Sequence, residues 1–185
     1  RTRTNAGLGI PAEPLFRSPN PFAAAAKPAG GALHNPFAAP AAGGGGGTFA
    51  IQLAKQLGAE ITAVDSAEKF EAMTEAGTDQ VIDYHTADYT RAGSSYDRIL
   101  DFVGSRPLLA NRRVLADGGI YLLVGGPMRR LLMAATTGWL ISRINGKHMG
   151  LLMARPNRDD LREAADLVAT GKLEPIIDRV YPLEE

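Results

Sequence analysis

From Gly43 onward, short apolar runs alternate with stretches in which apolar residues recur at helical spacing. The first helical stretch covers 48–58 and ends at a glycine stop signal. Its expected apolar face consists of Phe49, Ile51, Leu53, Ala54 and Leu57. A short run rich in β-branched residues follows at 60–64 and predicts a buried strand.

The same alternation continues to the end of the chain. Helices are predicted within 66–77, 105–119, 131–144 and 157–172, and strands within 80–84, 97–104, 120–126, 147–154 and 176–183. Ser66 is a candidate N-cap with Gly77 as the stop, and Ser105 opens a helix with Pro107 in its first turn. Strands that alternate with helices predict an α/β fold, a doubly wound and mostly parallel sheet of Rossmann type.

Residues 1–42 have a different pattern, rich in Pro, Ala and Gly. The prolines there are Pro11, Pro14, Pro19, Pro21, Pro28, Pro36 and Pro40. Because proline fixes φ and lacks an N–H donor, this spacing favours a disordered or extended segment over a helix or sheet. A proline-rich tail that binds a partner is the alternative. The expected division is therefore a 1–42 segment and a 43–185 α/β domain.

The five glycines Gly43–Gly47 are either a flexible linker or a phosphate-binding turn. They directly precede a helix, and Asp65 ends the next strand close to the roughly 20-residue spacing of the dinucleotide fingerprint. Glycines allow a pyrophosphate to approach the free amides that open a helix, and a carboxylate can accept hydrogen bonds from a ribose. The candidate anion-binding residues are Gly44, Gly45, Gly46, Gly47 and Thr48.

One element of the fingerprint is missing from this interpretation. A buried strand should precede the glycines, but the residues there read HNPFAAPAA, with two prolines and no β-branched side chain. The first, central strand is therefore expected to be absent or degraded.

The composition of the chain argues against several classes of function. Lys and Arg total 20 and Asp and Glu total 20, so no net charge favours nucleic acid or an anionic membrane. No apolar run is long enough to span a bilayer, and the N-terminus lacks the apolar core of a signal peptide, which predicts a cytoplasmic protein. There are no cysteines, and the 3 histidines have no metal-ligand spacing, so no metal site is expected.

Five stretches resemble the cofactor domain of the medium-chain dehydrogenase/reductase superfamily: 43–73 (GGGGGTFAIQLAKQLGAEITAVDSAEKFEAM), 78–84 (TDQVIDY), 96–104 (YDRILDFVG), 115–127 (LADGGIYLLVGGP) and 171–185 (GKLEPIIDRVYPLEE). The similarity is greatest to its zinc-independent quinone-oxidoreductase-like branch, which is also alcohol-dehydrogenase-like. The family pattern A-x-G-G-V-G corresponds to Ala42–Gly47, with Gly46 in place of the usual valine. The resemblance implies NAD or NADP as cofactor and hydride transfer involving a small hydrophobic carbonyl compound, quinone, enone or alcohol.

The resemblance also implies further contacts. Ser66, Lys69 and Tyr84 match positions that contact the 2′-phosphate in NADPH-using relatives. Backbone contacts to the nicotinamide end are implied at two turns, formed by Val103 and Gly104 and by Gly125 and Gly126. These glycines could instead only make tight turns, and Asp101 could be structural. Family members pair into dimers near the segment 149–154, so a homodimer is implied.

Asp65 and Lys69 bear on the choice of cofactor in opposite directions. A carboxylate repels a 2′-phosphate and a cation attracts it, and the balance modestly favours NAD.

The chain departs from the family at both ends. Nothing in 1–42 resembles the barrel-like domain that supplies most of the substrate pocket, and the sequence stops before the expected final helix and strand. Catalytic residues are therefore not assigned, enzyme status stays open, and weak or no turnover is expected of the chain alone. Two alternatives are a non-catalytic nucleotide-binding or dimerisation module and a methyltransferase-type domain.

Overall fold

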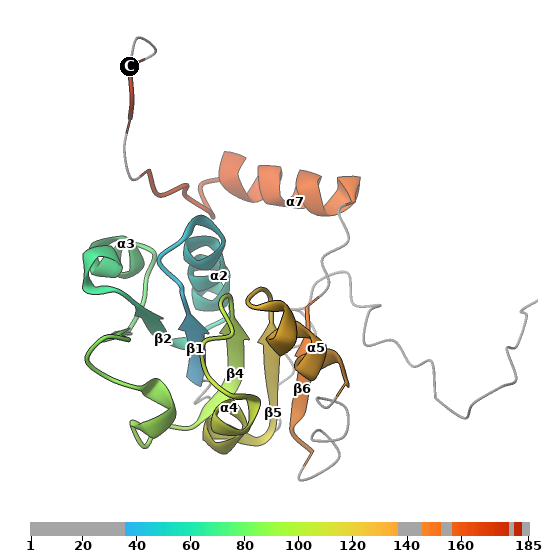
Figure 1. The fold of residues 1–185 in the computed structure, drawn as a ribbon. Helices are drawn as coiled ribbons and strands as arrows, with labels where there is room; N and C mark the ends of the chain where they lie inside the picture. Colours follow the sequence, from blue (N-terminus) through green and yellow to red (C-terminus); the bar gives the residue numbers. More distant parts are fainter. Residues whose placement is uncertain (1–35, 137–145, 153–156, 178–179, 183–185) are drawn as a thin grey trace, which may run out of the picture.

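A computed structural model describes residues 36–136, 146–152, 157–177 and 180–182. Within them, six strands form one sheet in the order β3-β2-β1-β4-β5-β6, with every neighbouring pair parallel (Figure 1). The strands are β1 Pro36–Pro40, β2 Glu60–Asp65, β3 Gln80–Asp83, β4 Tyr96–Asp101, β5 Leu115–Leu123 and β6 His148–Leu151. The parallel α/β sheet predicted from the sequence is confirmed.

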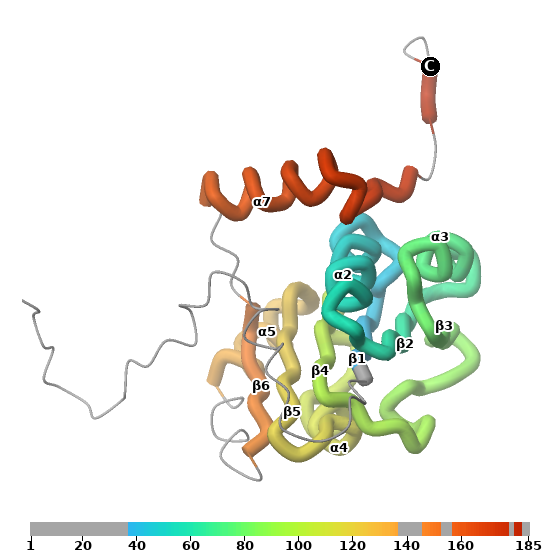
Figure 2. Tube along the Cα trace, turned by 180° about the vertical axis from the view of Figure 1, so that it is seen from behind, coloured from blue at the N-terminus to red at the C-terminus, as the bar shows by residue number. Residues whose placement is uncertain are grey.

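Helices lie on both faces of this sheet (Figures 1 and 2). The described helices are α2 Gly45–Gln56, α3 Phe70–Glu75, α4 Leu108–Val114, α5 Met128–Thr136 and α7 Arg158–Ala169, with short 3-10 turns η1 Ala67–Lys69 and η2 Tyr89–Arg91. None of them is long and apolar enough to cross a membrane, within the ranges described.

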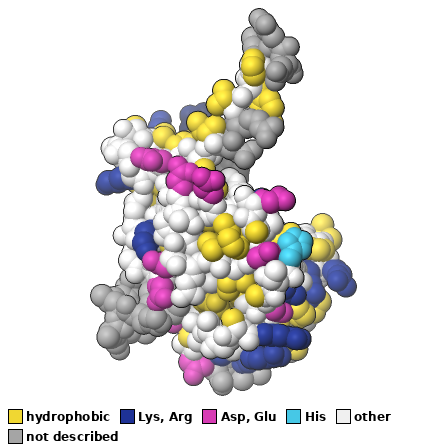
Figure 3. Space-filling view, turned by 90° about the vertical axis from the view of Figure 1, so that its left-hand side faces the viewer, with side chains coloured by type: hydrophobic (Ala, Val, Ile, Leu, Met, Phe, Trp, Pro, Cys, Tyr) yellow, Lys and Arg dark blue, Asp and Glu magenta, His cyan; other side chains and the backbone are white. Residues whose placement is uncertain are grey.

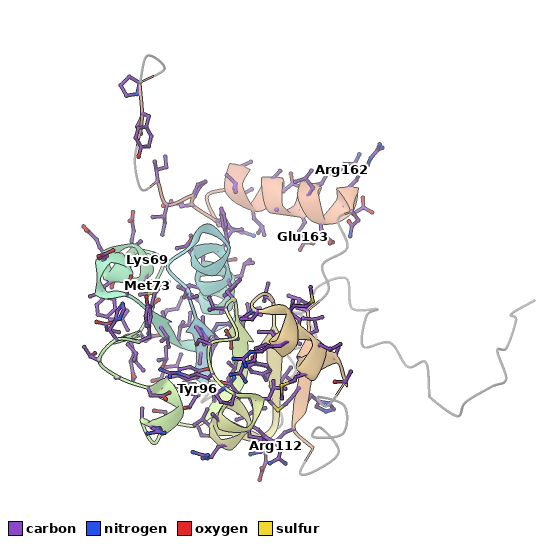
Figure 4. The ribbon with its side chains drawn as sticks, viewed as in Figure 1. Lys69, Met73, Tyr96, Arg112, Arg162 and Glu163 are labelled. Carbon is purple, nitrogen blue, oxygen red and sulfur yellow. The ribbon has the colours of Figure 1, made fainter. Side chains whose placement is uncertain are left out.

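The core consists of two apolar clusters, one on each face of the sheet. On the first face, α2 and α3 bury Ile51 and Met73 against alternate residues of β1 and β2, among them Phe37 and Ile61. Met73 points from α3 toward the strands in Figure 4. On the second face, α4 and η2 pack against β4 and β5, with Tyr121 among the buried residues there. Parallel sheets need cover on both faces, and these helices supply it over the central strands.

The first central strand, expected to be absent, is present. β1 pairs with β2 on one side and with β4 on the other. Pro36 and Pro40 occupy its two ends, where a missing N–H costs little, and Phe37, Ala38 and Ala39 lie between them. Ala38 and Ala39 have no exposed surface. The expectation was wrong because small side chains suit a strand covered closely on both faces, although they have low intrinsic β-propensity.

The expected buried side of α2 is confirmed for Ile51 and Ala54 and wrong for its larger residues. Gly47, Thr48, Ala50, Ile51 and Ala54 are buried, whereas Phe49 and Leu53 are half-buried and Leu57 is 46% exposed. Small residues face the sheet because α2 lies directly over the thin β1 strand. The stop signals are confirmed, since Gly58 and Gly77 have φ values of +74° and +102°, a region that favours glycine.

The C-terminal strand is not formed by the described residues predicted for it. Residues 174–177 and 180–182 have no regular secondary structure. Segment 172–174 instead lies beside α2, where the side-chain amide of Gln52 donates to the Glu174 carbonyl and accepts from the Glu174 amide, both at 2.8 Å. Of the segment 1–42 predicted to be disordered or extended, residues 1–35 lie outside the described residues and 36–40 form β1. Part of the helix predicted over 131–144 also lies outside the described residues.

Asp79 bonds to residues of both α2 and β2, and its pKa leads to a pH-dependent prediction. Asp79 accepts from Lys55 Nζ at 2.5 Å and from the Ile61 amide at 2.8 Å, and these bonds hold its pKa below the ordinary value of 3.8. A carboxyl with a depressed folded-state pKa stabilises the protein above pH 3.8, and this stability is lost as the pH falls further. We expect Asp79→Asn to lower stability at pH 7 by roughly 1 kcal/mol or less, because the pair is partly exposed.

The difference in Tm between wild type and Asp79→Asn should shrink as the pH is lowered from 7 to below 3.8. Asp117→Asn is the matched control, because the Asp117 side chain is 84% exposed and lies 3.7 Å from Lys147 Nζ. It should leave Tm unchanged at both pH values. A difference for Asp79→Asn that persists at low pH would contradict this account.

Candidate functional site

The predicted site residues follow the carboxyl ends of the parallel strands, and these ends meet at one edge of the sheet. The glycine turn follows β1, Asp65 ends β2, and Tyr84 follows β3. The turns containing Val103 and Gly125 follow β4 and β5. The strand order reverses between β1 and β4, which is the position where doubly wound folds bind ligands.

The N-terminus of α2 is open at the glycine turn. Gly44 is the N-cap, and no side chain caps the helix. The amides of Gly45, Gly46 and Gly47 therefore have no acceptor within the helix. Gly44, Gly45 and Gly46 are exposed, and a side chain added at Gly44 or Gly45 would meet nothing within 4 Å. This is the geometry of an anion site.

Thr48 lies deeper. Its hydroxyl donates to the Gly45 carbonyl and its amide donates to the Gly44 carbonyl, each at 3.0 Å, and the residue is 5% exposed. Its donors therefore stabilise the first turn of the helix, and the free amides precede it.

The two outer glycines of the run are needed for packing. A Cβ on Gly47 would lie 2.3 Å from the carbonyl oxygen of Ala42, and a Cβ on Gly43 would lie 2.5 Å from the Lys69 side chain. Ala41, just before the turn, has φ +63°, a left-handed conformation that costs an alanine about 1–2 kcal/mol. The backbone is thus forced to turn sharply, so that α2 starts directly against the end of β1.

Asp65 is tied to the glycine turn. Its Oδ2 accepts from the Gly43 amide at 2.9 Å and its Oδ1 accepts from the Ser66 amide at 2.8 Å. Lys69 Nζ lies 3.4 Å from Oδ1, and only 5% of the Asp65 side chain is exposed. A carboxylate can accept about four hydrogen bonds, so capacity remains for a ribose hydroxyl.

The other residues proposed for the adenosine end surround Asp65. The Lys69 side chain is 46% exposed, and Figure 4 shows it at the α3 end of the site. The amide of Tyr84 donates to the Asp65 carbonyl at 3.3 Å, and its ring, 48% exposed, packs against His85 with centroids 4.2 Å apart. The structure therefore brings Asp65, Ser66, Lys69 and Tyr84 together.

Asp101 organises the turn after β4. It has no exposed surface, and its Oδ1 accepts from the amides of Val103 at 3.0 Å and Gly104 at 2.8 Å. Its Oδ2 accepts from the Tyr121 hydroxyl at 3.0 Å. Burial, together with the charge of Asp101, raises the pKa of Tyr121 above its ordinary value of 10.0, so the phenol stays a donor. Asp101 is therefore structural, the alternative left open by the sequence.

The turns after β4 and β5 touch through their backbones. A Cβ on Gly125 would lie 2.8 Å from the Phe102 carbonyl oxygen, and one on Gly126 would lie 2.3 Å from that of Val103. Gly104 and Gly126 have φ values of +64° and +131°. These glycines thus have packing reasons of their own, and whether they also contact a ligand stays a prediction.

Two residues near the site were not singled out by the sequence. Gly43 holds Asp65 through its amide, but five identical glycines give no signal for which one does so. Phe102 lies across the switch point from α2, with its ring 3.5 Å from the position of a Cβ on Gly46. The sequence could have indicated Phe102 as a site residue, because it directly follows an aspartate that ends a strand.

Charge and metal-ligating groups are dispersed. Figure 3 shows a face on which acidic and basic side chains both occur. Among the described residues, no three His, Cys, Asp or Glu side chains come close enough to hold a metal ion. His85 and His148 are both exposed.

Comparison with known proteins identifies relatives. A family model described as zinc-binding dehydrogenase matches residues 76–185, more than half of the chain. The mitochondrial NAD(P)H oxidoreductase RTN4IP1 of Mus musculus is 34% identical over 159 residues, covering 75% of this chain and 40% of that protein. An NAD-dependent alcohol dehydrogenase of Sulfolobus acidocaldarius is 35% identical over 155 residues, covering 78% of this chain and 42% of that protein. The chain thus spans about two fifths of the length of these relatives.

Solved structures share the fold. The quinone oxidoreductase of Coxiella burnetii superposes with a TM-score of 0.64 at 25% identity, covering 80% of this chain and 45% of that one. The Escherichia coli quinone oxidoreductase complexed with NADPH gives a TM-score of 0.59 at 24% identity, with 77% and 48% covered.

The family description mentions zinc, but the donor set here does not fit it. The sequence contains no cysteine, and the described part of the chain offers no three-ligand cluster, whereas zinc sites in proteins use at least three side-chain ligands. The features that do fit this family are the glycine turn, Asp65 at the end of β2 and the order of the parallel strands. By its sequence match and its fold, the chain belongs to the medium-chain dehydrogenase/reductase superfamily and corresponds to its cofactor domain.

Proposed function

We propose that this chain binds NAD or NADP and is the cofactor-binding part of an oxidoreductase. The observation that carries the proposal is the contact between the glycine turn and the strand-ending acid, Gly43 N to Asp65 Oδ2 at 2.9 Å. It holds an anion-binding helix terminus and a ribose-binding carboxylate side by side, as a dinucleotide requires. The names of the matched relatives, NAD(P)H oxidoreductase and NAD-dependent alcohol dehydrogenase, support the same cofactor class.

In this proposal, the pyrophosphate lies on the amides of Gly45, Gly46 and Gly47. The adenosine ribose lies at Asp65, beside Ser66. The nicotinamide end extends across the switch point toward the turns at Val103–Gly104 and Gly125–Gly126, where it meets mostly backbone groups.

The reaction class proposed for the whole protein is hydride transfer to a quinone or enone, or from an alcohol. The bound nicotinamide supplies the hydride chemistry. The residues of this chain bind and orient it. No acid or base is assigned, because the two turns at the nicotinamide end contribute glycines, a valine and backbone groups.

Calorimetric titration of the 185-residue chain with NAD, NADP and ADP-ribose tests the binding proposal. Saturable 1:1 binding, weakened at least tenfold by Asp65→Ala, is expected. Absence of binding by all three ligands to a folded chain would refute it. Assay of NADH oxidation with a quinone panel separates a binding module from an enzyme, and low or no turnover is expected of this chain alone.

For the cofactor preference, we propose a modest bias toward NAD. The Asp65 carboxylate disfavours a 2′-phosphate, and Lys69, 3.4 Å from it, partly offsets that effect. Lys69→Ala should therefore weaken NADP binding about tenfold and change NAD binding less than threefold, since an unpaired carboxylate repels the phosphate. Titration of NAD and NADP into wild type and into Lys69→Ala gives the ratio of the two affinities for each protein.

Lys55→Ala is the control for this substitution. Lys55 lies in the last turn of α2 and pairs with Asp79, so neither cofactor affinity should change. Equal weakening of NAD and NADP by Lys69→Ala would contradict a role in discrimination.

Two further expectations stay predictions. A homodimer would pair the β6 strands of two copies, and light scattering of the purified chain measures this. A cytoplasmic location also stays a prediction, since matched relatives have mitochondrial and chloroplastic names.

A further inference from the structure

Four polar side chains are buried on the face of the sheet that α4 and η2 cover. They are Tyr89 from η2, Asp101 from β4, Asn111 from α4 and Tyr121 from β5, and each is at most 2% exposed. The Tyr89 hydroxyl donates to Asn111 Oδ1. The Tyr121 hydroxyl donates to Asp101 Oδ2 at 3.0 Å. These four side chains are called here the tyrosine network.

The two hydrogen-bonded pairs act on each other. Burial and the Asp101 charge raise the pKa of Tyr121, and the Asn111 side chain partly opposes this rise. Burial raises the pKa of Tyr89 as well, and the Asp101 charge adds to that effect. Both phenols therefore stay protonated and remain hydrogen-bond donors at neutral pH. The network thus connects η2 and α4 to the end of β4.

The η2 end of the network is held in place from several sides. Asp88, the N-cap of η2, accepts from the amide of Thr90 at 3.0 Å and from its hydroxyl at 2.8 Å. The same carboxylate lies 3.4 Å from Arg106 Nε, in the segment between β4 and α4. The Tyr89 ring packs edge-on against Tyr96, which lies near η2 and α4 (Figure 4), with ring centroids 6.3 Å apart. The Tyr89 hydroxyl therefore has a fixed position.

The chemistry of the network favours a role in orientation. Phenylalanine and leucine would fill the space of Tyr89 and Asn111 without the free-energy cost of burying a hydroxyl and an amide. The hydrogen bond between the two side chains offsets that cost, so it adds little net stability. Unlike an apolar contact, however, a hydrogen bond fixes the direction in which its donor and acceptor lie.

The network ends at a turn of the candidate site. The second oxygen of Asp101, Oδ1, accepts from the amides of Val103 at 3.0 Å and Gly104 at 2.8 Å. The Val103 carbonyl lies directly against the backbone of Gly126, since a Cβ on Gly126 would lie 2.3 Å from its oxygen. A rotation of the Asp101 side chain would therefore displace both turns at this end of the site.

We propose that Tyr89 and Asn111 are positioning residues for the nicotinamide half of the cofactor. They act through Tyr121, whose hydroxyl fixes the rotation of the Asp101 carboxylate, and the carboxylate in turn fixes the Val103–Gly104 turn. This inference rests on the proposed function, in which that turn meets the nicotinamide end. Because both residues are buried beneath the turn, their substitution changes the fit of one half of the cofactor and leaves the other half unaffected.

The double variant Tyr89→Phe/Asn111→Leu separates orientation from stability. It removes donor and acceptor together and keeps the approximate shape of both side chains, so Tm should stay within about 3 °C of wild type. The measured quantity is the affinity for NAD divided by the affinity for ADP, which lacks the nicotinamide and its ribose. This ratio should fall about fivefold in the double variant, while the affinity for ADP changes less than about twofold.

Hydrogen exchange measures the order of the turn without any cofactor. By NMR, the Gly104 amide should exchange about tenfold faster in the double variant than in wild type, because its acceptor is held less firmly. The Thr48 amide, at the start of α2, should exchange at the same rate in both proteins. If the double variant does not fold, Tyr89→Phe alone, which removes one hydroxyl, is used for both measurements, with changes expected in the same direction.

Tyr96→Phe is the matched control. It removes a buried hydroxyl from the same apolar cluster, outside the tyrosine network, and should change neither the affinity ratio nor the Gly104 exchange rate. A wild-type affinity ratio in the double variant, or an unchanged Gly104 exchange rate, would overturn the positioning role. Absence of binding of both NAD and ADP to wild type would instead refute the proposed function, and the exchange rate would still decide whether the network orders the turn.

Discussion

Asp101→Ala is expected to destabilise the protein by about 3–5 kcal/mol. The substitution leaves the amides of Val103 and Gly104 and the Tyr121 hydroxyl without their acceptor, and the bonds from Gly104 and Tyr121 are buried. Each orphaned buried donor costs about 1–3 kcal/mol. Total stabilities of natural domains are about 5–15 kcal/mol, so a large fraction would be lost. Thermal denaturation followed by circular dichroism should show Tm falling by about 10 °C or more.

Tyr121→Phe separates the contributions within this cluster. It removes one donor and leaves the two amide bonds to Asp101 intact, so a loss of about 1–2 kcal/mol is expected. A drop for Asp101→Ala no larger than that for Tyr121→Phe would mean that the turn is held by other groups.

Gly47→Ala is expected to damage both folding and cofactor binding. Its methyl group would lie 2.3 Å from the Ala42 carbonyl oxygen, and the backbone there cannot rotate away as a flexible side chain could. Overpacking of this kind costs about 1–3 kcal/mol or more. Moving α2 away from β1 also displaces the open amides, so NAD affinity should fall at least tenfold in a calorimetric titration.

Gly45→Ala is the matched control two residues earlier. A methyl group there meets nothing within 4 Å, and alanine is favoured over glycine in a helix by about 1 kcal/mol. This variant should be as stable as wild type or more so, and it controls for stability alone, because Gly45 lies in the proposed pyrophosphate site. Identical behaviour of the two variants would contradict the close packing of α2 on the turn.

The unit from the glycine turn to Asp65 could be predicted because each of its signals is local. A glycine run, a helical period, a glycine stop and a β-branched strand occur in order, and each depends on residues within a few positions of one another. The contact between Asp65 and Gly43 then follows from the parallel pairing of β1 with β2. The same reasoning located the strands that end at Asp83, Asp101 and Leu123.

β1 could not be predicted because its stability comes from its neighbours. Ala38 and Ala39 have little β-propensity, and the place of the strand is determined by hydrogen bonds to β2 and β4 and by cover from both faces. Part of the buried side of α2 was misjudged for the same reason, since a thin central strand favours Ala50 over the larger Phe49 and Leu53. The spacing of apolar residues shows which side of a helix is apolar. It does not show how much space the sheet leaves for each side chain.

The roles of Asp101 and Gly43 depend on contacts between distant segments. Asp101 and Asp65 each end a strand, and their sequence neighbours do not distinguish them. In the structure, Asp101 accepts from Tyr121, whereas Asp65 accepts from Gly43 in the glycine turn. The apolar run at 176–183 reads as a strand, but the described residues there have no strand partner in the sheet.

The parallel pairing of the whole described sheet has a kinetic consequence. No two neighbouring strands can meet through a hairpin, so Phe37 reaches Ile61 only after a helical crossover and reaches Arg98 only after a longer loop has closed. Such long-range pairings make the search for the native topology slow and leave apolar strands unpaired in the interval. Refolding from denaturant should therefore take seconds or longer, and nascent chains of this protein should rely on chaperones until β1 has joined its two neighbours.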